Sequence, residues 1–121
     1  MNNIVVAGGG VFGTSISERL AWNSNNNVVI HSVEEDVVES INTEHKNKKY
    51  FPTRFLNRSL KATTDYKVFE DADEIFLVIP SKAIVPFSKE IKKSSKSVTA
   101  SSLITQPPSL QNFLFLLYFF F

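Results

Sequence analysis

The stretch Asn2–Gly13 reads NNIVVAGGGVFG, and it decides the fold. Its first part contains Ile4–Ala7, a short apolar run without alternation, which is typical of a strand buried on both faces of a parallel sheet. Three consecutive glycines follow at Gly8–Gly10, with a fourth at Gly13, and the chain contains no others. Because glycine tolerates positive φ and lets other groups approach the backbone closely, this clustering indicates one specialised loop between a strand and a helix.

The spacing of Gly8, Gly10 and Gly13 matches the pattern G-x-G-x-x-G in the position that a dinucleotide-binding loop requires. In such a loop Gly8 makes the tight turn, Gly10 leaves room for a pyrophosphate, and Gly13 lets the helix pack on the strand. The amides and dipole of the following helix then meet the phosphate charge. The alternative is a tight structural turn that binds no ligand.

Strands and helices alternate along the rest of the chain. Strands are expected at Asn2–Ala7, Val28–Ile30, Leu60–Thr63, Glu74–Ile79 and Ser97–Leu103. Helices are expected at Phe12–Asn23, Glu34–Asn42, Tyr66–Ala72 (capped by Thr64 or Asp65) and Ala83–Lys93, and His45–Arg58 is expected to be irregular. Their inward-facing apolar residues would be Phe12, Ile16, Leu20 and Ala21, then Val37, Val38 and Ile41, then Ile84, Phe87 and Ile91. This alternation predicts an α/β fold, a Rossmann-type parallel sheet with flanking helices and right-handed crossovers.

The end of the second predicted strand indicates which dinucleotide is held. The sequence His31–Asp36 contains Glu34, Glu35 and Asp36 but no arginine or lysine. An acidic residue here accepts hydrogen bonds from the ribose of NAD, and it would repel the 2′-phosphate of NADP. We therefore expect NAD as the cofactor rather than NADP, with Glu34 at the ribose. The acidic triplet also suits the first turn of a helix, and different residues of it can serve the two roles.

Composition excludes several classes of function. The 121 residues suffice for one domain, and 13 basic and 12 acidic residues give a net charge of +1 without a nucleic-acid-binding footprint. The absence of cysteine excludes disulfides, thiolate metal sites and cysteine catalysis, and we expect no metal site. No signal peptide is evident at the amino end, so a cytoplasmic protein is expected.

The end of the chain differs from the rest. No charged residue follows Lys96, and Phe113–Phe121 is an apolar run far shorter than the roughly 20 residues of a membrane-spanning helix. We expect a dinucleotide-binding domain over residues 1–104 and an unrelated apolar tail over residues 105–121, disordered or read through from a truncated or frame-shifted gene.

Three stretches of the chain resemble NAD(P)-dependent glycerol-3-phosphate dehydrogenase of the soluble type. The first is Gly8–Ser17, with an aromatic residue before the last glycine of the loop and a small residue after it. The second is Ser40–Pro52, which resembles the family's I-N and N-x-x-Y-L-P, followed by Leu60–Asp65, which resembles its L-x-A-T-x-D. The third is Ala72–Ser81, which resembles A-D-x-I-x-x-x-V-P-S. The second stretch is the most specific, since other Rossmann enzymes lack it, and the resemblance covers about residues 3–100.

The resemblance implies hydride transfer between NAD(P)H and dihydroxyacetone phosphate, giving sn-glycerol 3-phosphate for phospholipid synthesis. It places Val11 and Phe12 along the cofactor phosphates and ribose. Val33 falls where bacterial members often carry a phosphate-binding arginine or histidine, so its presence again favours NAD. Tyr50, Pro80 and Ser81 would line the nicotinamide side.

The departures from the family pattern concern catalysis. The family's first catalytic lysine follows the fifth strand, in a segment resembling Ala100–Thr105, and no lysine follows Lys96 here. The helical substrate domain, with its second lysine, aspartate and arginine, has no counterpart. We therefore expect no catalytic residue in this chain, cofactor binding without turnover, and dihydroxyacetone phosphate as a partner in a full-length form alone. The sequence predicts no oligomeric state.

Two other functions stay open. One is a dehydrogenase of a 2-hydroxy or 3-hydroxy acid, which the stretch Asn47–Pro52 disfavours. The other is a non-catalytic dinucleotide-binding module.

Four other groups of residues have simpler interpretations. His31 is expected to be a packing or polar surface residue rather than a catalyst, and His45 to be solvated. The basic run Lys46, Lys48 and Lys49 is typical of a solvated face more than of a phosphate site. Trp22 is expected to pack near a helix end.

Overall fold

The computed structural model describes residues 1–80, 84–94, 99–100, 104–106 and 119–120. Ser81 and most of the predicted strand at 97–103 lie outside the described residues. So do the side chains of Pro80, Ile84 and Ile91.

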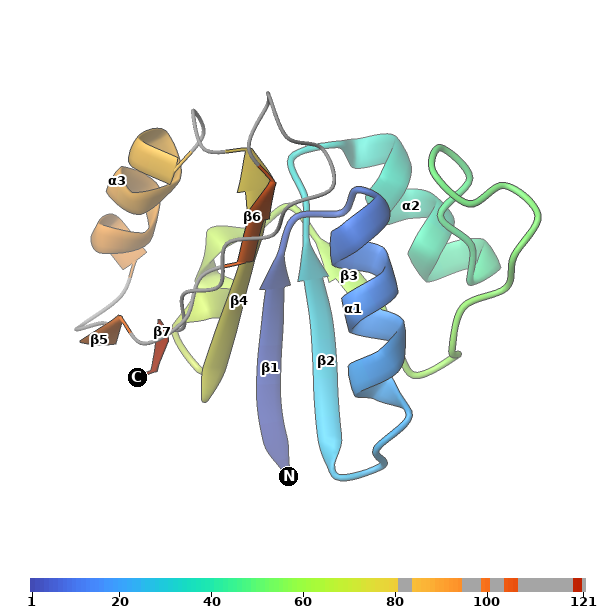
Figure 1. Cartoon of the computed structure of the whole chain (residues 1–121), viewed down its shortest axis with the longest axis horizontal. Helices are drawn as coiled ribbons and strands as arrows, with labels where there is room; N and C mark the ends of the chain where they lie inside the picture. Colours follow the sequence, from blue (N-terminus) through green and yellow to red (C-terminus); the bar gives the residue numbers. More distant parts are fainter. Residues whose placement is uncertain (81–83, 95–98, 101–103, 107–118, 121) are drawn as a thin grey trace.

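A parallel sheet forms the centre of the molecule (Figure 1). Its four main strands are β1 (Asn2–Ala7), β2 (Asn26–His31), β3 (Lys61–Thr63) and β4 (Glu74–Pro80), and their spatial order is β3-β2-β1-β4. In register, Ala7 of β1 lies opposite His31 of β2 and Leu77 of β4. The carboxyl ends of the central strands therefore meet at one edge, where ligands bind in sheets of this kind.

Helices connect these strands near the predicted positions. They are α1 (Val11–Ala21), α2 (Glu35–Glu44), the 3₁₀ helix η1 (Tyr66–Phe69) and α3 (Ile84–Ser94). The carboxylate of Asp65, rather than Thr64, caps η1 by accepting a hydrogen bond from the amide of Lys67 at 2.9 Å. The predicted α/β class is confirmed. None of the helices in the described part of the chain is long and apolar enough to cross a membrane.

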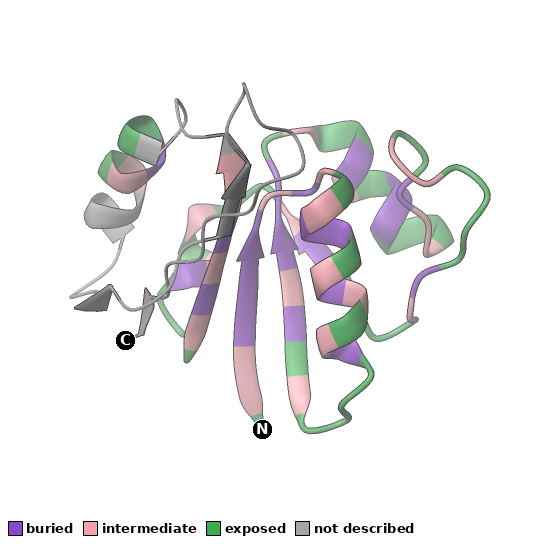
Figure 2. Ribbon diagram, viewed as in Figure 1, coloured by how far each residue is buried: buried purple, intermediate pink, exposed green. Residues whose placement is uncertain are grey.

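The strand β1 is buried on both faces, as its sequence predicts. Ile4 and Val6 belong to a core with residues of α1, α2 and β2, whereas Val5 and Ala7 belong to a second core with residues of η1, β4 and α3. Alternate side chains of a strand point to opposite faces, so β1 separates the two cores. Figure 2 shows this burial concentrated in the strands and on the inner sides of the helices.

Small residues form the fully buried face of α1. Its buried residues are Gly13, Thr14, Ser17 and Ala21, whereas Phe12, Ile16 and Leu20 are half-buried. The buried Ser17 hydroxyl donates to the carbonyl of Gly13 at 2.7 Å, which satisfies it within the helix. Ala21 is buried as predicted, and Leu20 packs against the first core. The prediction was wrong for Phe12 and Ile16, because small side chains allow α1 to lie close to the sheet. On α2, Val37 and Ile41 are buried as predicted.

The far edge of the sheet differs from the prediction of one strand at 97–103. The parallel partner of β4 is β6 (Ile104–Gln106), with Ile104 opposite Val78. Residues Thr99–Ala100 form β5, which pairs antiparallel with β7 (Phe119–Phe120), and β7 pairs antiparallel with β4. Apolar residues on both sides of position 103 leave this boundary undefined in the sequence. The predicted domain boundary after residue 104 falls within β6, and the character of the tail stays a prediction.

Trp22 does not pack at the end of α1 as predicted. Its side chain is 63% exposed, and the Arg19 guanidinium carbon lies 4.7 Å from the ring centroid. One turn of helix separates the two residues, so the Arg19 guanidinium stacks on the Trp22 indole, which lies outside the core.

Candidate cofactor cleft

The glycine loop is a close-packed turn at two of its positions. Gly8 has a φ of +130°, and a Cβ there would lie 2.1 Å from the carbonyl oxygen of Val78 on β4. A Cβ on Gly13 would lie 1.9 Å from the carbonyl oxygen of Gly8. Both clashes are with backbone, which cannot move aside as a flexible side chain does. These two glycines therefore fix the turn itself, as their predicted roles require.

Gly10 differs, because the space beside it is open. A Cβ on Gly10 would meet no atom of the described part of the chain within 4 Å. Packing against these residues therefore does not require glycine here. An open cradle at the second glycine of the pattern is the arrangement that a bulky anion approaching the backbone needs.

The amino end of α1 faces the same space. Gly10 is the N-cap and offers no side chain, and within the described residues the amides of Val11, Phe12 and Gly13 have no hydrogen-bond acceptor. The first amides of a helix carry partial positive charge and attract anions. The loop itself is anchored to β2, because the Gly8 amide donates to the carbonyl of His31 over 2.8 Å.

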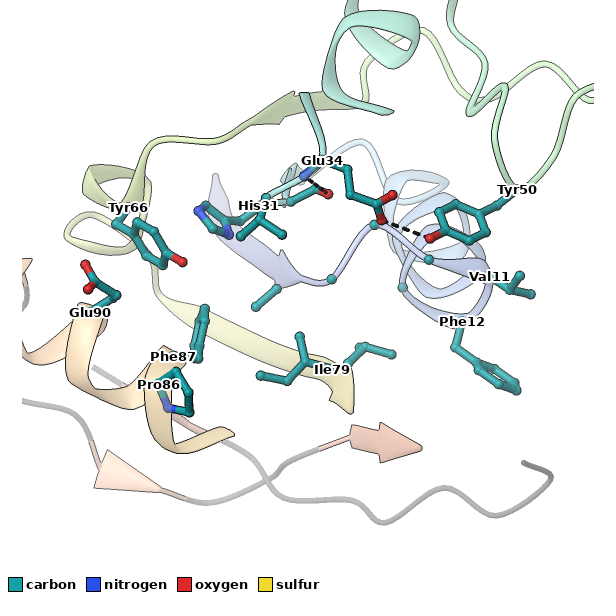
Figure 3. A pocket seen from close by; sticks show the side chains of 18 residues that line it. Val11, Phe12, His31, Glu34, Tyr50, Tyr66, Ile79, Pro86, Phe87 and Glu90 are labelled. Carbon is teal, nitrogen blue, oxygen red and sulfur yellow. Dashed lines mark hydrogen bonds between the residues drawn. The ribbon is translucent and has the colours of Figure 1, made fainter. Parts of the chain in front are cut away.

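A cleft of about 590 Å³ opens above the loop at the carboxyl edge of the sheet. This volume lies within the range of ligand pockets, about 300–1,000 Å³. Figure 3 shows Glu34 and Tyr50 on one side of the loop, and Tyr66, Phe87 and Glu90 on the other. The lining residues are Ala7, Gly8, Gly9, Gly10, Val11, Phe12, Gly13, His31, Ser32, Val33, Glu34, Tyr50, Tyr66, Val78, Ile79, Pro86, Phe87 and Glu90.

Most of the predicted cofactor residues thus lie around one cleft. The structure brings together Gly8, Gly10, Val11, Phe12, Gly13, Val33, Glu34 and Tyr50. Pro80 ends β4, and Ser81 lies outside the described residues. Val33 is 75% exposed at the rim. Tyr50 contacts Glu34 beyond the end of β2, so its predicted place beside the nicotinamide stays a prediction.

Glu34 is the acidic residue that turns toward the cleft. Its Oε1 accepts a hydrogen bond from the Tyr50 hydroxyl at 2.9 Å, and its Oε2 forms an ion pair with Lys49. Glu35 and Asp36 lie instead in the first turn of α2, where their charge favours the helix dipole. Glu35 and Asp36 thus fill the helix-start role, and the ribose role of Glu34 stays a prediction.

The contacts of Glu34 alter the titration of its neighbours. Donation to the carboxylate raises the pKa of Tyr50, with burial as a second cause. The hydrogen bond to Glu34 also raises the pKa of Lys49. Both neighbours thus stay protonated at neutral pH, each as a donor to the Glu34 carboxylate.

His31 packs at the floor of the cleft, as one of its two expected roles requires. It is 2% exposed, its ring centroid lies 4.3 Å from that of Tyr66, and its Nε2 lies 3.1 Å from the carbonyl oxygen of Thr64. Burial lowers the pKa of His31 against the opposing effects of the Thr64 carbonyl and the Asp65 charge. The ring is therefore neutral, and it belongs to an aromatic cluster with Tyr66, Phe69 and Phe87.

The segment after α2 is more ordered than its sequence suggests. His45 is half-buried at the end of α2 with a φ of 56°, and its Nδ1 is enclosed, so the expectation of a solvated ring was wrong. Within the basic run, Lys46 lies over the Phe55 ring at 4.2 Å, and Lys48 pairs with Glu44 at 2.6 Å. Lys48 and Lys49 are exposed, as expected of a solvated run, whereas Lys46 is half-buried.

Asn47 is the residue that reasoning from sequence missed. It is fully buried, and its Nδ2 donates to the Gly9 carbonyl at 2.8 Å and to the Thr14 hydroxyl at 2.9 Å. The one sign of its importance in the sequence was its place in the family-specific stretch Asn47–Pro52. The sequence does not show that this side chain, 38 residues away, reaches under the glycine loop.

Three features define a Rossmann-type nucleotide-binding domain. They are a parallel sheet, a turn whose backbone contacts require glycine, and a cleft above the amino end of α1. Within this class, residues 3–105 match the family described as the NAD-dependent glycerol-3-phosphate dehydrogenase N-terminus. The chain therefore belongs to the family of NAD-dependent glycerol-3-phosphate dehydrogenases, a family of oxidoreductases. The resemblance stated from its motifs is confirmed, and NAD, the expected cofactor, agrees with the family description.

Individual relatives agree with this assignment. A glycerol-3-phosphate dehydrogenase (NAD(P)+) of Neorickettsia sennetsu is 38% identical over 92 residues, which are 76% of this chain and 27% of that protein. One of Exiguobacterium is 38% identical over 111 residues, which are 91% of this chain and 30% of that protein. The solved glycerol-3-phosphate dehydrogenase of Coxiella burnetii superposes with a TM-score of 0.74 at 27% identity, covering 88% of this chain and 32% of that one. This chain thus spans less than a third of the relatives that it matches.

Proposed function

We propose that the cleft binds NAD, with the pyrophosphate at Gly10 and the amino end of α1 and the adenosine ribose near Glu34. The open space at Gly10 carries this proposal, since no contact with the described residues explains a glycine there. The unpaired first amides of α1 would donate to the phosphate oxygens, and the Glu34 carboxylate would accept from a ribose hydroxyl. The same carboxylate would repel the 2′-phosphate of NADP, so NAD is the preferred form.

The reaction proposed for the longer protein is hydride transfer between this cofactor and dihydroxyacetone phosphate, giving sn-glycerol 3-phosphate. When bound, the reduced cofactor supplies the hydride. The residues of this chain bind and orient it, and the apolar side chains of Val11, Phe12 and Ile79 exclude water from the cleft. Reduction of a ketone also needs a proton donor and a group that binds the substrate phosphate. With no lysine after Lys96, we propose that residues 1–121 alone bind the cofactor without turnover.

Titration of the whole chain with NADH and with NADPH tests the binding proposal. We expect saturable NADH binding that is tighter than NADPH binding at the same ionic strength. Gly10→Asp is the matched variant, because its side chain enters open space and brings a negative charge to the pyrophosphate position. It should keep the fold and lose NADH binding. Absence of NADH binding by the folded wild-type chain, or unchanged binding by Gly10→Asp, would contradict the proposal.

Turnover is tested separately. Purified chain mixed with NADH and dihydroxyacetone phosphate should show no NADH oxidation above the rate without protein. Measurable oxidation would overturn the statement that residues 1–121 lack a proton donor, and it would leave the binding proposal standing.

A further inference from the structure

We propose that Asn47 is a positioning residue that turns the peptide between Gly9 and Gly10 so that its N–H points into the cleft. The inference rests on the proposed function, because it assigns this N–H as a donor to the cofactor pyrophosphate. It concerns a residue outside the glycine loop, 38 positions along the chain.

The contacts of Asn47 fix its orientation. Its Nδ2 donates to the carbonyl of Gly9 at 2.8 Å and to the hydroxyl of Thr14 at 2.9 Å, while its Oδ1 accepts from the amide of Tyr50 at 3.3 Å. The Thr14 hydroxyl in turn donates to the same Gly9 carbonyl at 3.3 Å. Both donors on the Gly9 oxygen therefore lie on the protein side of the loop.

The direction of the Gly10 N–H follows from the planarity of the peptide between Gly9 and Gly10. The structure contains no cis peptide bond in its described part, so the N–H of Gly10 points opposite to the C=O of Gly9. Asn47 and Thr14 are fully buried and do not line the cleft, whereas Gly9 and Gly10 do. A carbonyl held on the buried side places the neighbouring N–H on the cleft side. Among the described residues nothing accepts a hydrogen bond from that N–H.

Asn47 also joins the two halves of the cleft. Its backbone carbonyl accepts from the amide of Phe51 at 2.7 Å, which closes the turn that carries Tyr50. The Tyr50 hydroxyl then reaches Glu34. Through its side chain and its backbone, Asn47 thus contacts both the glycine loop and the turn that brings Tyr50 to Glu34.

The four glycines of the chain provide the readout. All of them lie in the loop, so selective ¹⁵N-glycine labelling of the full chain gives amide signals from the loop alone. Gly10→Ala, which enters open space, removes one signal and identifies it. In the wild-type chain the Gly10 signal should shift on addition of NADH.

Asn47→Ala is the test variant, and Asn42→Ala is its control. Asn42 also makes two hydrogen bonds, both at 2.9 Å, to the backbone of Ala62, and it does not line the cleft. We expect both variants to lose stability in urea unfolding. Only Asn47→Ala should move the Gly10 signal in the free protein and weaken NADH binding, by at least about tenfold, the effect of losing one hydrogen bond to a charged group.

The outcomes separate the two proposals. Equal NADH dissociation constants and an unmoved Gly10 signal in Asn47→Ala would overturn the role of Asn47 while NADH binding by the wild type stands. If the wild type binds no NADH, the proposed function fails, and the Gly10 signal of the free variants still decides whether Asn47 orients the peptide. Should Asn47→Ala not fold, Asn47→Asp keeps the shape and the bond to the Tyr50 amide but loses both donors. It should show the same displaced Gly10 signal.

Discussion

The hydroxyl of Tyr50 donates a hydrogen bond of 2.9 Å to the carboxylate of Glu34, and the two residues are 16 positions apart in the chain. This contact brings the segment after α2 against the end of β2. It also fixes the orientation of the Glu34 carboxylate, which is proposed to bind the ribose. A carboxylate held by a phenol on one oxygen and by Lys49 on the other has little freedom to turn away from the cleft.

Glu34→Gln should reduce the preference for NADH over NADPH. The amide keeps the size of the side chain but removes the charge that opposes a 2′-phosphate, so NADPH binding should tighten while NADH binding weakens a few-fold. Titrations of both cofactors at one ionic strength measure the ratio. Glu35→Gln is the control, since it removes the same charge from the neighbouring position in the first turn of α2. An equal change of the ratio in both variants would show that general charge, not the position of Glu34, sets the preference.

Glu34→Gln should also lower the pKa of Tyr50. The hydrogen bond to the carboxylate is the main cause of the raised pKa, so the phenol should ionise at lower pH once the charge is gone. Absorbance titration of the folded chain in the alkaline range, compared with Glu35→Gln, measures the difference. A tyrosine titration curve identical to that of wild type would contradict the assigned contact.

The stability of the chain should fall as the pH drops through the range in which free histidine titrates. Burial lowers the pKa of His31 below its ordinary value of 6.5, so the unfolded chain takes up a proton at a pH at which the folded chain does not. The free energy of unfolding therefore decreases as pH falls from above 6.5 to the lowered pKa, and this contribution is constant below it. The charge of Asp65 acts on this ring, and the charge of Glu90 acts on the neighbouring Tyr66.

His31→Phe should remove this part of the pH dependence. Urea unfolding of both proteins at several pH values gives the two slopes, and the wild-type slope should be the steeper one below pH 6.5. Parallel slopes would mean that His31 takes up its proton equally in the folded and unfolded states.

Gly13→Ala and Gly10→Ala should differ sharply in stability. The new methyl group on Gly13 would meet the Gly8 carbonyl, and the loop or α1 must shift, which we expect to destabilise the fold by at least about 2 kcal/mol. The methyl group on Gly10 enters open space, so the change there should stay within about 1 kcal/mol, and helix or loop propensity sets its sign. Thermal and urea unfolding of the two variants and the wild type measure these stability differences. Similar losses in both variants would contradict the different roles assigned to the two glycines.

Phe69→Ala should cost about 3–5 kcal/mol, because this side chain is fully buried between the sheet and α3. Phe55→Ala is the matched phenylalanine, since Phe55 is 69% exposed and its recorded ring contact is with Lys46. We expect its loss to stay below about 1 kcal/mol. Urea unfolding of the two variants measures the difference, and equal losses would show that the second core does not stabilise the fold as described.

The sequence predicted the parts of the fold that local patterns encode. The unbroken apolar run at Ile4–Ala7 and the glycine spacing after it specify a buried strand, a turn and a helix, and the structure has all three. The helical spacing of Val37 and Ile41 likewise predicted the buried face of α2. These features depend on neighbours within a few residues, which is why one sequence suffices to recognise them.

What the sequence did not predict depends on contacts between distant segments. The small residues Thr14 and Ser17 are buried against the sheet because of how closely α1 approaches it, which the apolar pattern of α1 does not reveal. Asn47 contacts Gly9 from 38 positions away, and Tyr50 contacts Glu34 from 16 positions away. At the far edge, the parallel partner of β4 begins at Ile104, because tertiary pairing rather than local preference determines where that strand lies.

The central position of β1 in the sheet determines how rigid the glycine loop at its end is. Its amides and carbonyls are bonded to strands on both sides, so hydrogen exchange there should require opening of the whole sheet, whereas β3 at the edge opens more readily. The loop that begins at Gly8 is thus attached to the slowest-exchanging part of the domain. A binding loop attached to such a strand is already rigid in the free protein. Ligand binding should therefore cost the protein little conformational entropy.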